Sequence, residues 1–175
     1  MANKFRGKVI WFTGLSGAGK STLSNALEKY LTKLKFKILC IDGDKFRKKT
    51  KNKNNFTREN IFKNNYLIIN YILKKQDNYD YLLVSVISPL KKTRNRAKKV
   101  FSAKYFEVFV KCNIKELKRR DTKGLYRLAD EKKIKDLIGY KSKIKYEISN
   151  YEIITVDTFK MNLKNSITKI VKKIL

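Results

Sequence analysis

The chain has 175 residues, of which 42% are apolar, and its 43 Lys and Arg against 15 Asp and Glu give a formal net charge of +28. This length and apolar content suit one globular domain with a sizeable core, and no apolar run approaches the ~20 residues of a membrane-spanning helix. The sequence contains no histidine, which excludes histidine-based catalysis.

The positive charge is the most prominent feature of the composition. A basic chain can bind nucleic acid, and a basic nucleic-acid-binding protein is one alternative function. However, the lysines are spread from Lys4 to Lys173 among many Asn and Ile residues, and no nucleic-acid-binding motif localises them. We therefore expect no nucleic acid as biological partner and no membrane association. The N-terminus is too short for a signal peptide before the first strand, so the expected location is the cytoplasm.

A glycine-rich loop lies near the start of the chain, between an apolar strand at Lys8–Thr13 and a helix at Thr22–Leu34. The loop reads G-x-x-x-x-G-K-S, the phosphate-binding motif of nucleoside-triphosphate enzymes. Its backbone N–H groups and the helix N-terminus would face phosphate oxygens, Lys20 would reach the β- and γ-phosphates, and the Ser21 hydroxyl would coordinate Mg²⁺. We predict MgATP binding by Gly14, Leu15, Ser16, Gly17, Ala18, Gly19, Lys20, Ser21 and Thr22.

Two carboxylates follow the second predicted strand, Lys37–Ile41, in the sequence Asp42-Gly43-Asp44. Ligands of open α/β sheets gather at the carboxyl ends of strands, so both carboxylates should lie near the phosphate loop. Asp42 would hold the water shell of the metal, and Asp44 would accept a proton from an attacking hydroxyl. The alternative is a plain Asp-Gly turn with solvated carboxylates.

A polar stretch, Lys48–Asn55, precedes Phe56, which would either anchor this loop or stack on a base. Thr57 suits the N-cap of a helix over Arg58–Lys75. The predicted buried face of this helix comprises Phe62, Tyr66, Ile69 and Leu73, widened by Ile61, Ile68 and Ile72.

The rest of the chain continues to alternate strands and helices. Strands are expected at Tyr81–Ile87, Tyr105–Val110 and Tyr151–Val156. Helices are expected after the third strand, with Pro89 in the first turn, at Ile114–Arg120 and at the C-terminus. Ser88, at a strand end, would face the crevice or simply cap a helix. The alternation predicts an α/β P-loop NTPase fold with a parallel, five-stranded, doubly wound sheet, as one domain over 1–175. Lid segments are expected at about 48–60 and 121–140.

Together these segments resemble the adenylylsulfate (APS) kinase family. The resemblance runs from Gly7 to about Glu147. It rests on the loop region and on Asp42-Gly43-Asp44 with Arg47, Phe56, Glu59-Asn60-Ile61, Ile87-Ser88-Pro89, Glu107–Val110, Arg120–Tyr126 and Ile134-Lys135. It implies transfer of the γ-phosphoryl group of ATP, with Mg²⁺, to the ribose 3′-hydroxyl of APS by a homodimer.

The resemblance also assigns roles to individual residues. Catalysis would fall to Asp44, Lys20 and Asp42, and Arg120 would lie beside the ATP base. Ser88 matches a serine sometimes described as a phosphoserine intermediate, although direct in-line transfer needs none. The acceptor nucleotide would contact Asp44, Arg47, Phe56, Asn60, Ile87, Ser88 and Lys123.

Three departures from the family pattern fall on the acceptor side. Thr57 stands where the family has an arginine, for which Arg58 could substitute; Asp136-Leu137 replaces a Gly-Phe whose ring helps to enclose the acceptor adenine; and Lys91 replaces an arginine. Leucine cannot stack as an aromatic ring does. An alternative acceptor is therefore a cytidine diphosphate conjugate such as CDP-phosphoramidate, used in some bacterial capsule pathways, because a pyrimidine needs less stacking area.

Overall fold

The computed structural model describes residues 6–49 and 56–175. Five strands form one parallel sheet in the order β2-β3-β1-β4-β5. These strands are β1 (Lys8–Thr13), β2 (Ile38–Asp42), β3 (Tyr81–Ser85), β4 (Tyr105–Lys111) and β5 (Ile154–Asp157). The α-helices are α1 (Lys20–Lys33), α2 (Gly43–Lys49), α3 (Arg58–Lys75), α4 (Lys91–Phe101), α5 (Ile114–Arg120), α6 (Leu125–Asp130) and α7 (Leu163–Ile174). The predicted fold class is confirmed.

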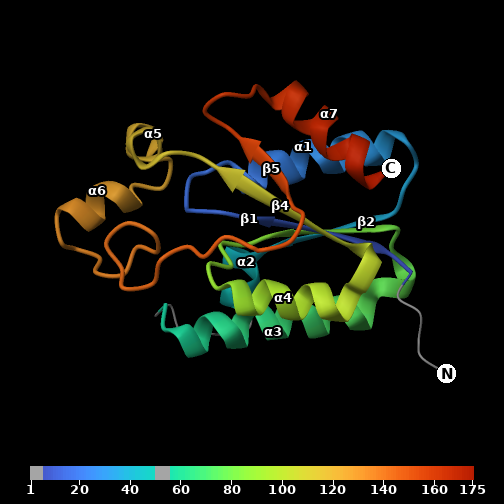
Figure 1. Cartoon of the computed structure of the whole chain (residues 1–175), viewed down its shortest axis with the longest axis horizontal. Coiled ribbons are helices and arrows are strands. Elements are labelled where there is room, and N and C mark those ends of the chain that lie inside the picture. The colour runs from blue at the N-terminus through green and yellow to red at the C-terminus, as the bar shows by residue number, and fades with distance from the viewer. Residues whose placement is uncertain (1–5, 50–55) are drawn as a thin grey trace.

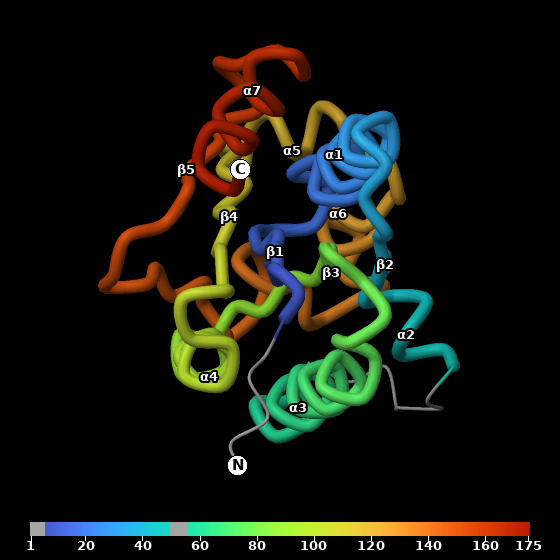
Figure 2. The backbone as a smooth tube through the Cα atoms, turned by 90° about the vertical axis from the view of Figure 1, so that its right-hand side faces the viewer, coloured from blue at the N-terminus to red at the C-terminus, as the bar shows by residue number. Residues whose placement is uncertain are grey.

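The sheet is sandwiched between two helical layers, with α1 and α7 on one face and α3 and α4 on the other (Figures 1 and 2). The central strand β1 supplies both cores because successive side chains point to opposite faces. Ile10 and Phe12 pack with α1 and α7, whereas Val9 and Trp11 pack with α3 and α4. A strand buried on both faces reads as the continuous apolar run seen in the sequence.

The crossovers create a crevice at the carboxyl edge of the sheet. The strands β1 and β3 are neighbours, but the helices that follow them, α1 and α4, cover opposite faces. Chain segments therefore diverge at this point, where ligands of doubly wound sheets bind. The crevice is bordered by the glycine loop after β1 and by Ser88 and Pro89 after β3.

Several details differ from the sequence-based expectations. Tyr66 and Leu73, predicted to be buried, are 46% and 38% exposed, and Asn64 and Asn65 lie on the buried side of α3 instead. Pro89 precedes Leu90, the N-cap of α4, and so lies outside the helix. Within the described residues, no helix is long and apolar enough to cross a membrane.

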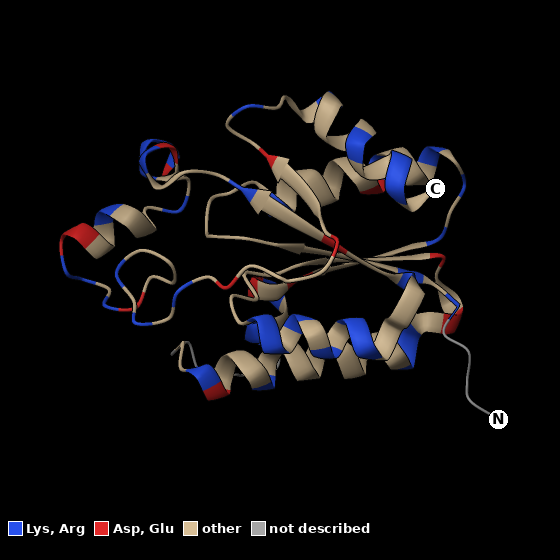
Figure 3. Cartoon of the chain, in the orientation of Figure 1, with Lys and Arg blue, Asp and Glu red and all other residues tan. Residues whose placement is uncertain are grey.

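Lysine and arginine residues are distributed over the helices on both faces of the sheet (Figure 3). The expected lid at about 48–60 is divided in the structure. Lys48 and Lys49 end α2, Arg58–Asn60 begin α3, and residues 50–55 lie outside the described part of the chain. The expected lid at 121–140 contains α6 and a series of turns.

Candidate active site

The glycine loop has the backbone of a phosphate cradle. Gly14, Gly17 and Gly19 have φ angles of 140°, 74° and 100°, which side-chain-bearing residues rarely adopt. A Cβ atom at Gly14 would collide with the Val110 carbonyl oxygen of β4. Gly19 is the N-cap of α1, so the free N–H groups of this 14-residue helix point into the loop. These features fit the phosphate groups of a nucleotide.

The Lys20 side chain folds back onto the backbone of the loop. Its Nζ donates hydrogen bonds to the carbonyl oxygens of Gly14, at 3.0 Å, and Leu15, at 2.8 Å. The pKa of Lys20 is lowered to about 8, first by burial and then by the nearby Lys123, against the opposing effect of Asp44 and Asp42. A bound phosphate would stabilise the protonated form of this buried lysine by supplying a negative charge next to it.

Ser21 and Asp42 bring two oxygen ligands together at the mouth of the loop. Ser21 Oγ donates to Asp42 Oδ2 at 3.1 Å. The other carboxylate oxygen of Asp42 accepts hydrogen bonds from the backbone N atoms of Asp44, at 3.0 Å, and Lys45, at 3.1 Å, at the start of α2. A hydroxyl beside a carboxylate fits Mg²⁺, which prefers oxygen ligands and keeps phosphate and water in its other positions.

Asp44 is held between two cations from different parts of the chain. Its Oδ1 pairs with Arg47, one turn later in α2, and its Oδ2 accepts a hydrogen bond from Lys123 Nζ at 2.6 Å. Burial alone would raise the pKa of Asp44, but Lys123 and Arg47 outweigh burial and lower it. The carboxylate is therefore ionised at neutral pH and close to Lys20.

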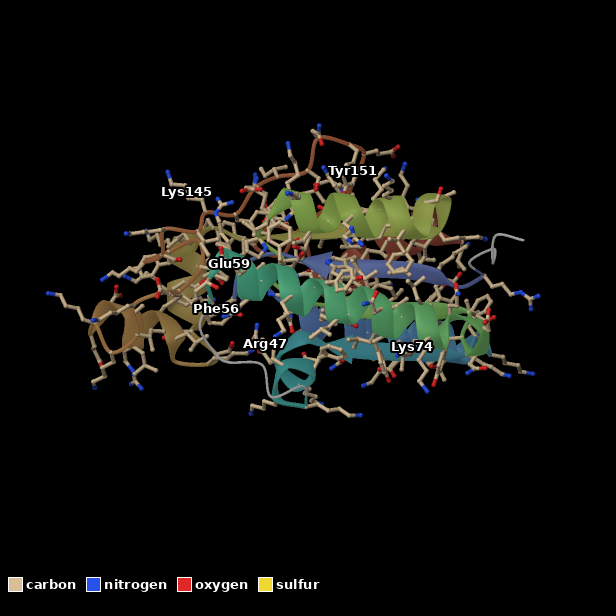
Figure 4. The ribbon with its side chains drawn as sticks, turned by 90° about the horizontal axis from the view of Figure 1, so that it is seen from below. Arg47, Phe56, Glu59, Lys74, Lys145 and Tyr151 are labelled. Atoms are coloured by element: carbon tan, nitrogen blue, oxygen red, sulfur yellow. The ribbon has the colours of Figure 1, made fainter. Side chains whose placement is uncertain are left out.

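A pocket beside Asp44 is formed mainly by α3, the end of β3 and the segment after it. It is lined by Arg47, Phe56, Asn60, Ile61, Asn64, Asn65, Val86, Ile87, Ser88, Pro89 and Ile138. Five residues predicted to contact the acceptor are among them, namely Arg47, Phe56, Asn60, Ile87 and Ser88. Arg47 lies over the Phe56 ring, 5.0 Å from its centroid, and Figure 4 shows both at the end of α3 opposite Lys74.

Four predicted acceptor residues are not among the lining residues: Asp44 and Lys123, which pair with each other beside the pocket, and Arg58 and Leu137. The Arg58 side chain is 60% exposed and pairs with Glu147 at 3.6 Å. Leu137 is 5% exposed and packs into the core on the α1 side of the sheet, away from this pocket. Its neighbour Ile138 lines the pocket instead, because the chain turns between the two residues. No aromatic ring is supplied by this segment at the position of the family's Gly-Phe.

Ser88 supports the pocket wall. It is buried, its φ is 40°, and its Oγ donates to Asn65 Oδ1 at 2.8 Å. The Thr93 hydroxyl lies 3.1 Å away and itself donates to the Leu90 carbonyl oxygen. A hydroxyl whose proton is committed in this way is poorly placed to be phosphorylated, which favours direct transfer over the phosphoserine route.

A second side of the loop is formed by α5 and the end of β5. Arg120 donates from Nη2 to the Thr158 carbonyl oxygen at 2.8 Å and from Nη1 to Thr158 Oγ1 at 3.1 Å. Thr158 Oγ1 in turn lies 2.9 Å from the Ala18 carbonyl oxygen of the loop. Arg120 is thus placed beside the phosphate loop, and its assignment to the ATP base stays a prediction. Sequence reasoning missed Thr158, although its position just after the fifth strand could have indicated it.

Tyr126 is a further residue that the sequence prediction did not assign. Its hydroxyl donates to the Ser16 carbonyl oxygen at 2.9 Å, and its side chain is buried. Asp121 fixes the start of α6 by accepting hydrogen bonds from the backbone N atoms of Tyr126 and Arg127, both at 3.0 Å. The segment that places Lys123 on Asp44 is therefore also attached to the phosphate loop.

The fold and this site define a nucleoside-triphosphate-dependent phosphotransferase of the P-loop kinase class. The family model described as adenylylsulphate kinase matches residues 6–155. This chain belongs to the adenylylsulphate kinase family.

Individual relatives agree with this assignment. The adenylyl-sulfate kinase of Clostridium acetobutylicum is 33% identical over 169 residues, 97% of this chain and 84% of the relative. A probable adenylyl-sulfate kinase of Archaeoglobus fulgidus is 37% identical over 152 residues, which are 87% of this chain and 96% of the relative. The APS kinase of Mycobacterium tuberculosis, solved with AMPPNP and APS, superposes with a TM-score of 0.86 at 27% identity, covering 95% of this chain and 96% of that one.

Proposed function

We propose that this chain transfers the γ-phosphoryl group of ATP to the ribose 3′-hydroxyl of adenylyl sulfate, giving 3′-phosphoadenylyl sulfate. One observation carries the proposal. Residues that the family resemblance assigns to the acceptor line a single pocket, and one of them, Arg47, is paired with Asp44. The acceptor hydroxyl and the phosphate loop would therefore meet at Asp44.

Different residues would bind the phosphoryl donor, ATP, and the acceptor nucleotide. Lys20 and the loop N–H groups would hold the phosphates, while Ser21 and Asp42 would hold Mg²⁺. When bound, Mg²⁺ neutralises charge on the phosphate oxygens. Asp44 would orient the 3′-hydroxyl and take its proton late in the transfer. A loose transition state requires little proton transfer to a base. An ionised carboxylate of lowered pKa, which is a weak base, is therefore sufficient.

A second acceptor, a cytidine diphosphate conjugate such as CDP-phosphoramidate, is favoured by one feature of the pocket. The segment that supplies an aromatic ring in the family resemblance supplies Ile138 here, so Phe56 is the aromatic lining residue in the described part of the chain. A pyrimidine ring requires less stacking surface than adenine.

A coupled ADP-release assay with Mg²⁺ and ATP tests both acceptors. We expect turnover with APS at a higher kcat/KM than with CDP-phosphoramidate, and the reverse order would select the second acceptor. No ADP release with either nucleotide would refute the kinase proposals. Salt-sensitive RNA binding in such an inactive chain would instead support the nucleic-acid-binding alternative.

We further infer a homodimer, which the family resemblance supports, and a cytoplasmic location. Sedimentation velocity at micromolar concentration tests the first, with a single monomeric species contradicting it. Cell fractionation tests the second.

A further inference from the structure

A buried side-chain oxygen without a hydrogen-bond donor belongs to a residue that lines the acceptor pocket. Asn64, in the second turn of α3, is 6% exposed and lines the pocket, yet no described residue donates a hydrogen bond to its Oδ1. Leaving a buried carbonyl oxygen without a donor costs about 1–3 kcal/mol. Such an atom in a native structure calls for an explanation, and a bound ligand that supplies the donor is one.

The polar groups next to Asn64 already have partners. Asn65 Nδ2 donates to the Ile61 carbonyl oxygen at 2.8 Å, and Asn65 Oδ1 accepts from Ser88 Oγ at 2.8 Å. Among described residues, the other buried unpartnered side-chain atoms are on Trp11, Gln76 and Ser85, none of which lines the pocket. Among the described residues that line this pocket, Asn64 therefore supplies the buried side-chain oxygen that lacks a donor.

The surroundings would strengthen a hydrogen bond made there. Ile61, Val86, Ile87 and Ile138 give the pocket that Asn64 lines a largely apolar wall. In such a low-dielectric environment a hydrogen bond is stronger than in water, and a mismatched polar group costs more. A site of this kind discriminates sharply between ligand groups that donate and groups that do not.

We propose that Asn64 Oδ1 accepts a hydrogen bond from the exocyclic amino group of the acceptor nucleotide's base. The proposal rests on the proposed function, which assigns this pocket to the acceptor. Adenine and cytosine both carry an amino donor, whereas hypoxanthine and uracil carry an oxygen at the same position. Asn64 would then be a specificity residue that admits amino bases and rejects their deaminated counterparts, while Phe56 packs on the ring.

Equilibrium binding of four 5′-monophosphates in the presence of MgADP tests this directly. The pairs are AMP with IMP and CMP with UMP, which differ in the amino group, and calorimetry gives each Kd. We expect the wild-type chain to bind the amino member at least about tenfold more tightly in one or both pairs. Asn64→Val should reduce that ratio to about twofold or less, whereas Asn64→Asp, which keeps an acceptor oxygen, should retain a preference for the amino member.

Gln76→Met is the matched control because Gln76 Oε1 is also buried and unpartnered but lies beyond the far end of α3. It should leave the ratio unchanged. Thermal unfolding of Asn64→Val should occur at or above the wild-type temperature, since the substitution removes an unsatisfied polar group. An unchanged ratio in Asn64→Val would overturn the proposal, as would equal wild-type affinity for both members of both pairs. These ratios do not depend on turnover, so failure of the kinase proposal in the ADP-release assay is a separate result.

Discussion

Lys123 Nζ lies 2.6 Å from Asp44 Oδ2, although the two residues are 79 positions apart in the chain. The contact joins the segment before α6 to the start of α2. It places the ammonium group of Lys123, in the lid expected at 121–140, on the Asp44 carboxylate that is proposed to orient the acceptor hydroxyl.

Replacing Lys123 with Gln should shift the pH dependence of turnover. Burial raises the pKa of Asp44, and Lys123 is the main group that lowers it again. Without Lys123 the pKa of Asp44 rises, so the ionised carboxylate is lost at a higher pH. The acid limb of the kcat/KM profile should therefore move to higher pH in Lys123→Gln. An acid limb that does not move would show that this limb does not report Asp44.

Asp44→Asn should separate chemistry from ATP binding. We expect kcat to fall by about 10²- to 10⁴-fold, because the variant loses both the group that orients the acceptor hydroxyl and the group that takes its proton. The Kd of MgATP should stay within about threefold of wild type because Asp44 lies on the acceptor side of the loop. Single-turnover kinetics and calorimetry give the two quantities, and retention of wild-type turnover would exclude Asp44 as the base.

MgATP affinity should fall as the pH rises above about 8. The pKa of Lys20 is lowered to about 8 in the unliganded chain, so above that pH the lysine must be protonated as the phosphates bind. Binding should take up protons near pH 8.5, which calorimetry in buffers of different ionisation enthalpy detects. Lys20→Arg keeps its charge at this pH and should abolish the proton uptake. Equal uptake in the variant would assign the proton to another group.

The ion pair between Arg94 of α4 and Glu107 of β4 should be important for stability. Nε and Oε1 are 3.1 Å apart, and the side chains are 0% and 1% exposed. Arg94→Met leaves the glutamate buried without its partner and should cost about 3–5 kcal/mol in the free energy of unfolding. The double variant Arg94→Met/Glu107→Gln should recover part of this loss in urea denaturation. A double variant as unstable as the sum of its single variants would argue against coupling.

Much of the fold could be predicted because local signals and tertiary packing agree. The helix at Arg58–Lys75 has the predicted bounds, and its cap forms as expected, with Thr57 Oγ1 accepting from the Asn60 backbone N at 3.2 Å. The loop after β1 and the carboxylates after β2 meet because the ends of parallel strands share one edge of the sheet. Strand order brought the acceptor residues together in the same way.

The remaining features depend on packing that a periodic pattern does not encode. The helix α2 has a charged sequence in which Gly43 is the buried residue, so nothing distinguished it from an Asp-Gly turn. Tyr66 is exposed because it lines an open groove between α3 and α4, where Arg96 lies over its ring, 5.0 Å from the centroid. The choice of Ile138 over Leu137 for the pocket is set by a turn in an irregular segment, where neither helical nor strand periodicity applies.

The segment from Arg120 to Tyr126 connects three parts of the site. Arg120 is bonded to Thr158 beside the loop, Lys123 to Asp44, and Tyr126 to the Ser16 carbonyl oxygen. A ligand at either subsite that displaces this segment changes the free energy of binding at the other. Linkage requires the effect to be reciprocal, so the factor by which ATP alters acceptor affinity must equal the factor by which the acceptor alters ATP affinity. Displacement of this one short segment would thereby couple the binding of the two substrates.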